Sequence, residues 1–151
     1  MTLRSRTGGP ADRAREPETE RWTCESFLWT RPREFTSPLH AQGTLVSSPA
    51  RLAFVSGQVG VRADGTTGDD VDQQTRIVFE NVTRVLAEAG LDLSGLASLT
   101  TYLTSHDHID SFTRAANDCL GGHRPAATLL IVEHLANPAL LVQVEAVAVG
   151  G

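Results

Sequence analysis

Apolar residues recur with helical spacing in two segments of the chain. In residues 71–89 the intervals are 7, 4, 3 and 4, which places Val71, Val78, Val82, Val85 and Ala89 on one face of an α-helix. Residues 107–120 follow the same period. Asp69 or Asp70 can cap the first helix, and Gly90 can end it. The pattern therefore predicts two amphipathic helices.

Shorter segments are rich in β-branched and apolar residues and are bounded by turn residues. These predicted strands span 44–48, 52–59, 96–103, 127–133 and 139–149. The turn at Pro49 predicts that the first two form a β-hairpin. The resulting order is β-β-α-β-α-β-β, which predicts an α+β sandwich with two helices on one sheet.

The final strand alternates between two faces. We expect one face to pack under the helices: Leu140, Val142, Val144, Ala146 and Ala148. The other face holds Leu141, Gln143, Glu145, Val147 and Val149. Because this second face is also mostly apolar, we expect another subunit to cover it. Glu145 would then be a buried carboxylate near an interface, either paired with an arginine or backbone donors of a neighbouring chain, or used as a general acid or base.

The composition divides the 151 residues into three parts. Residues 1–20 hold almost no large apolar side chains and are predicted to be a disordered tail. Residues 21–43 contain both tryptophans, Trp22 and Trp29, and are predicted to form an arm packed on the domain or a wall of a cleft. Residues 44–151 form the folded domain.

The charge excludes several classes of function. The net charge is −5 and the chain has no lysine, so we expect no nucleic-acid partner, and Schiff-base catalysis by a lysine is excluded. No apolar run is long enough for a membrane span, and the N-terminus lacks a signal-peptide core. We therefore expect a cytoplasmic protein without a membrane partner and without a cofactor.

Few motifs point to chemistry. His106 and His108 flank an aspartate, but two residues apart they do not share a helix face, so we expect no metal site. Cys119 falls on the apolar side of the second helix and is interpreted as a core residue. The run Ser56-Gly57-Gln58 interrupts an apolar strand, which is typical of a bulge or of close approach by a ligand.

The chain resembles the YjgF/RidA family, also called endoribonuclease L-PSP. The resemblance covers about residues 44–149, through FVSGQVG at 54–60, QTRIVFENVTRVLAEAGLDLSGL at 74–96, TTYLTS at 100–105, HRPAATLLIVEHL at 123–135 and VQVEAVAV at 142–149. It implies the same α+β sandwich. It also implies a homotrimer whose sheets pack into a central barrel, with three ligand clefts between subunits.

The resemblance further implies a site. RidA-type members hydrolyse enamines and imines, such as 2-aminoacrylate, to a keto acid and ammonia. The family's glutamate matches Glu145, and its Ser-Gly backbone matches Ser56 and Gly57. The arginine that clamps the substrate carboxylate falls on Ala127, followed by Thr128, and the helix asparagine falls on Thr113. The family's tyrosine has no clear counterpart.

Three functions remain open at this stage. The first is a diverged enzyme that uses Glu145 as general acid or base on a small imine, enamine or carbonyl compound, for hydrolysis, dehydration, tautomerisation or cyclisation. Its substrate contacts would include Gln58 and Gln143 beside the matched residues. The second is a non-catalytic binding or regulatory trimer. The third is an ordinary 2-aminoacrylate deaminase in which another arginine, Arg51 or Arg124, supplies the clamp.

Overall fold

The computed structural model describes residues 23–27, 41 and 43–151. The predicted tail 1–20, Trp22 and Trp29 lie outside the described residues. The strands are β1 (Thr23–Phe27), β2 (Gly43–Ser47), β3 (Arg51–Val59), β4 (Leu96–Leu103), β5 (Ala126–Ile131) and β6 (Val142–Gly150). The helices are α1 (Val71–Glu88) and α2 (Ile109–Leu120), with short 3₁₀ turns at Leu93–Gly95 and His106–His108. None of the described helices is long and apolar enough to cross a membrane.

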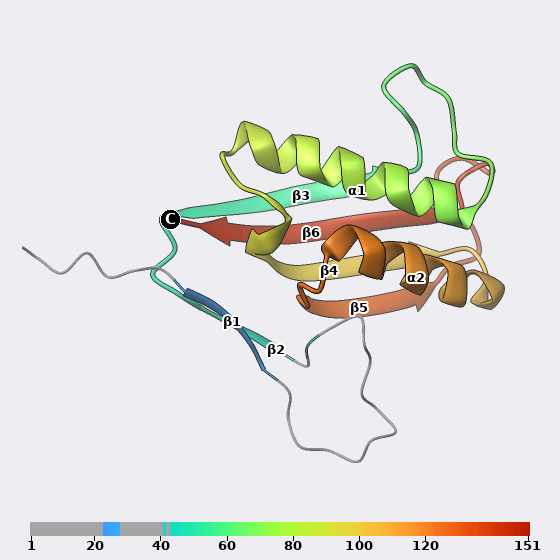
Figure 1. The fold of residues 1–151 in the computed structure, drawn as a ribbon. Coiled ribbons are helices and arrows are strands. Elements are labelled where there is room, and N and C mark those ends of the chain that lie inside the picture. Colours follow the sequence, from blue (N-terminus) through green and yellow to red (C-terminus); the bar gives the residue numbers. More distant parts are fainter. Residues whose placement is uncertain (1–22, 28–40, 42) are drawn as a thin grey trace, which may run out of the picture.

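Four strands form one sheet, in the order β3-β6-β4-β5, and both helices lie on one face of it (Figure 1). β4 and β5 run parallel, because α2 carries the chain from one to the other, and the remaining pairs are antiparallel. The core lies between helices and sheet and includes Phe79, Leu86 and Phe112. The α+β sandwich expected from the sequence is therefore confirmed.

The alternation of the last strand is also confirmed. Val142, Val144, Ala146 and Ala148 are buried under the helices, each at most 4% exposed. Both ends of α1 follow the sequence signals as well. The side chain of Asp70 accepts a hydrogen bond from the N–H of Gln73, and Gly90 takes a positive φ of 66° just after the helix.

The predicted hairpin is wrong. β2 does not pair with β3 but with β1, in a separate two-stranded sheet, while β3 pairs with β6. The chain bends at Ser48, where φ is 47°, and the strands on either side of this bend belong to different sheets. β2 instead reaches the start of β5, where the Thr44 hydroxyl accepts a hydrogen bond from the N–H of Ala126.

β6 begins three residues later than expected, at Val142 rather than Ala139. The cause is Gln74, a side chain only 1% exposed. Its amide nitrogen donates to the carbonyls of Gly68 (3.0 Å) and Ala139 (2.8 Å), and its amide oxygen accepts from the N–H of Leu141 (2.8 Å). The backbone before β6 therefore pairs with a side chain of α1 instead of a strand.

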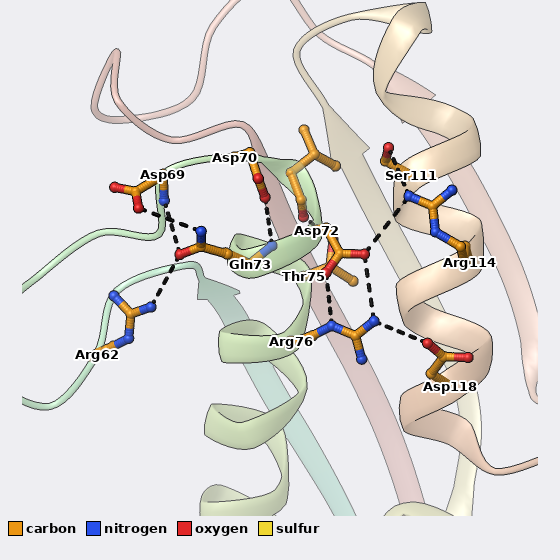
Figure 2. A network of polar contacts seen from close by, with 11 residues as sticks. Arg62, Asp69, Asp70, Asp72, Gln73, Thr75, Arg76, Ser111, Arg114 and Asp118 are labelled. Carbon is orange, nitrogen blue, oxygen red and sulfur yellow. Dashed lines mark hydrogen bonds and ion pairs between the residues drawn. The ribbon is translucent and has the colours of Figure 1, made fainter.

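An exposed polar network joins the two helices on their outer side (Figure 2). Arg76 of α1 donates to Asp72 at 2.8 Å and to Asp118 of α2 at 3.0 Å. The hydrogen bond from Arg76 holds the pKa of Asp72 below its ordinary value, and the two carboxylates raise the pKa of Arg76. These charges are therefore satisfied within the helical layer, away from the opposite face of the sheet.

Candidate functional site

A row of polar residues crosses the sheet on the face that points away from the helices. Glu145 of β6 lies opposite Thr100 of β4, which lies opposite Thr128 of β5. On the other side of β6, Ser56 and Gly57 of β3 face Glu145. The carboxylate is therefore in the middle of the sheet, with hydroxyl-bearing residues on both sides.

The two residues of β3 that face Glu145 form a β-bulge. Val55 pairs with Ala146 and Gln58 with Val144, so two residues of β3 stand against one of β6. The side-chain amide of Gln58 donates to the Ser56 carbonyl at 2.9 Å, across this bulge. The sequence signal of a glycine within an apolar strand is thus confirmed as a bulge.

Gln143 lies on the same face, one alternate position from Glu145. Its side-chain amide occupies the space beside Gly57, where an added Cβ would collide with it. A side chain at position 57 would therefore displace Gln143, and glycine lets both residues occupy the bulge as they stand.

A pocket of about 230 Å³ opens at this row. It is lined by Phe54, Val55, Ser56, Ser98, Thr100, Glu145, Ala146 and Val147. The Tyr102 hydroxyl donates to Glu145 Oε2 at 3.4 Å, which orients the carboxylate from the neighbouring strand. No salt bridge involves Glu145 among the residues that the structure describes.

Glu145 is exposed in the single chain, and its burial at a subunit interface stays a prediction. It is exposed because the face to which it points has no second layer. On the same face, Phe54 is 77% exposed and Leu52 is 55% exposed. These two apolar side chains are thus open in one chain, whereas Val149, which alternation places on the same face, is only 1% exposed.

Two residues matched from the family do not join the row. Ala127 of β5 lies opposite Leu99 and packs against the core on the helix face. Thr113 is half-buried on α2, in the helical layer. Within one chain, both are therefore separated from Glu145 by the sheet.

The two candidate replacement arginines also lie away from the row. One guanidinium nitrogen of Arg51 donates to the carbonyls of Ala89 and Gly90, both at 3.1 Å, at the C-terminal end of α1. Such a contact between a cation and the negative end of a helix is favourable. Arg124 is half-buried just before β5, and neither arginine is among the described residues that line the pocket.

Sequence reasoning missed three polar members of this face. Ser98, Thr100 and Tyr102 occupy alternate positions of β4, opposite the core residues of that strand. The same alternation argument that oriented Glu145 would have found them. Cys119, by contrast, packs against the core as expected, and burial raises the pKa of its thiol, which disfavours the nucleophilic thiolate.

Comparison with known proteins places this fold and its glutamate-bearing strand in a family. Residues 40–150 match the family model described as Endoribonuclease L-PSP. The chain belongs to the YjgF/RidA family. A RutC family protein of Pyrococcus abyssi is 30% identical over 99 residues, which is 63% of this chain and 76% of that protein. The RutC family protein YjgH of Escherichia coli is 42% identical over 57 residues, and this match spans only 38% of the chain and 44% of YjgH.

Solved structures agree with this YjgF/RidA assignment. The Rid family protein YyfB from Yersinia pestis superimposes with a TM-score of 0.72 at 25% identity, covering 83% of this chain and 98% of that one. E. coli TdcF, solved with bound serine, gives a TM-score of 0.64 at 22% identity, covering 83% and 94% of the two chains, and supports the fold alone.

Proposed function

We propose that this YjgF/RidA chain hydrolyses a small imine or enamine, with Glu145 as the general acid and base. The observation that carries the proposal is an exposed carboxylate at the floor of a pocket, oriented by the hydroxyl of Tyr102 and free of any ion pair among the described residues. A structural glutamate would instead be buried, lie outside a pocket and form an ion pair with an arginine. The geometry therefore favours an acid–base catalyst over a non-catalytic binding trimer.

The reaction needs one proton-transfer group used twice. The Glu145 carboxylate takes a proton from water as the water oxygen attacks the carbon of the protonated C=N group, which forms a neutral carbinolamine. The carboxylic acid then returns the proton to nitrogen. As the C–N bond breaks, the hydroxyl proton of the carbinolamine passes to water, and a carbonyl compound and ammonia leave. For an enamine, Glu145 in its acid form first protonates carbon, which gives the imine. Hydroxyls beside it, from Ser56 and Thr100, can hold the polarised group in place.

We further propose that the working cleft is completed by other copies of the chain in a homotrimer. Three apolar residues on the far face of the sheet, Leu52, Phe54 and Leu130, are each more than 40% exposed. Ala127 and Glu145 lie on opposite faces of one sheet, so a cleft that contains both positions must join two chains.

The ordinary 2-aminoacrylate deaminase is the weaker candidate. It requires an arginine in place of Ala127, and Arg51 is bonded to the end of α1. A lost charge-assisted clamp of this kind costs about 1.5–3 kcal/mol, hence roughly a tenfold to hundredfold loss of affinity. We therefore place the substrate outside the small α-imino acids.

Ammonia release tests the proposed reaction. The protein is mixed with a series of imines freshly generated by an amine oxidase, and ammonia release is followed over time without any added trapping nucleophile. We expect at least one imine to release ammonia faster than in buffer, because Glu145 supplies the base that free water lacks. Release at the spontaneous rate across the series would contradict the proposal.

A further inference from the structure

Among the described residues of one chain, the pocket at the polar row is lined by one acidic side chain and no basic one. Glu145 is the one charged side chain among its described lining residues, the others being Phe54, Val55, Ser56, Ser98, Thr100, Ala146 and Val147. The hydrogen bond from the Tyr102 hydroxyl orients the carboxylate but adds no positive charge. The part of the pocket that one chain contributes is therefore anionic, and Glu145 is called its anionic floor below.

This charge distinguishes between ligands of opposite sign. Two unit charges attract or repel more strongly as water is excluded between them, so a cation gains and a carboxylate loses when it approaches Glu145. The hydroxyls of Ser56, Ser98 and Thr100 are neutral and do not offset the repulsion of a second carboxylate. The floor thus selects against anionic substrates.

The flank of the pocket is apolar. Phe54 of β3 is 77% exposed and lies opposite Val147 of β6. Val147 is two residues after Glu145 in the same strand and therefore lies on the same face. An aromatic ring beside a carboxylate suits a cation that carries a hydrocarbon group, because the ring face also attracts positive charge. The two features together describe one kind of ligand.

We propose that this pocket selects protonated imines that carry no carboxylate and have a short hydrocarbon body. This inference rests on the proposed function and names its substrate class. Water adds to the protonated C=N carbon, the C–N bond breaks, and an aldehyde or ketone leaves with one ammonium ion. The reaction that supplies this substrate is therefore expected to be the oxidation of a primary amine at the carbon that bears the nitrogen, rather than the oxidation of an amino acid.

A matched pair of imines tests the class. Oxidation of isobutylamine by an amine oxidase gives 2-methylpropan-1-imine, and oxidation of valine by an amino-acid oxidase gives the same skeleton with a carboxylate on the imine carbon. Each is compared with its own hydrolysis in buffer. We expect the acceleration to be at least about tenfold larger for the imine without carboxylate, because only the carboxylated one brings a second negative charge to Glu145. An equal or larger acceleration of the carboxylated imine would overturn the inference while leaving the proposed hydrolysis intact.

A binding measurement keeps the inference decidable if neither imine is hydrolysed. Isobutylammonium and valine are titrated into the full-length protein and followed by backbone NMR shifts. We expect isobutylammonium to shift β4 and β6 resonances and to bind at least about tenfold more tightly than valine. Glu145→Gln should abolish this preference, and Glu133→Gln, an exposed glutamate in the loop after β5, should keep it. Equal binding of both compounds would refute the substrate class, whereas selective binding without hydrolysis would refute only the proposed reaction.

Discussion

Glu145→Gln is expected to lower kcat for imine hydrolysis by about 10²–10⁴-fold, the usual contribution of a general acid or base. Glutamine keeps the shape of the side chain and can still accept the hydrogen bond from Tyr102, but it can neither take a proton from water nor return one to nitrogen. Steady-state ammonia release at saturating imine measures the effect. Because Glu145 is exposed in the chain, the substitution should not alter folding.

The matched control is Glu133→Gln. Glu133 is also an exposed glutamate, in the loop that follows β5, and its carboxylate lies 3.5 Å from the Nε2 atom of His134. Its loss should leave kcat within about twofold of the wild-type value, since surface substitutions away from a site are usually near neutral. Equal kcat values for Glu145→Gln and the wild-type protein would eliminate Glu145 as the acid–base group.

Gln74→Leu is expected to lower the free energy of unfolding by about 3 kcal/mol, because each buried polar group left without a partner costs about 1–3 kcal/mol. Leucine fills a similar volume but removes the hydrogen bonds to the carbonyls of Gly68 and Ala139 and to the N–H of Leu141. Urea unfolding at one fixed protein concentration measures the loss, with the slope m expected to stay constant.

The neighbouring glutamine supplies the control for this substitution. Gln73 is only half-buried, and its side chain makes contacts of 3.4–3.5 Å to Arg62 and Asp69 at the surface. Gln73→Leu should therefore cost less than about 0.5 kcal/mol. If the two variants were equally stable, the side chain of Gln74 would not hold the segment before β6.

The parts of the fold that follow from local patterns were predictable from the sequence. Helical spacing located α1 and α2, and alternation assigned the faces of most of β6, because each repeat follows which side chains are buried. Two positions were wrong: Val85 of α1 is 42% exposed, and Val149 at the end of β6 is 1% exposed. The hairpin failed because its prediction used only the closeness of two strands and the turn signal of Pro49. The actual partner of β3 is β6, about 90 residues later in the chain, and no local pattern encodes that pairing.

The candidate site was predictable only in part. Glu145, Ser56 and the bulge at Gly57 follow from residue types that break an apolar strand. The contribution of Tyr102 needs the register of β4 against β6, which the sequence does not specify. The position of Ala127 was also not predictable. A motif aligns this residue with the family but does not say on which face of the sheet it lies.

Chemical rescue of Glu145→Ala tests the central claim most directly. Alanine leaves room beside the bulge for a small carboxylate, and formate in the buffer can then act as the missing acid and base. The account predicts a low rate of imine hydrolysis that rises in proportion to formate concentration, with no such rise in the wild-type protein. A rate that is already equal to wild type, or one that stays low at every formate concentration, would contradict proton transfer by Glu145.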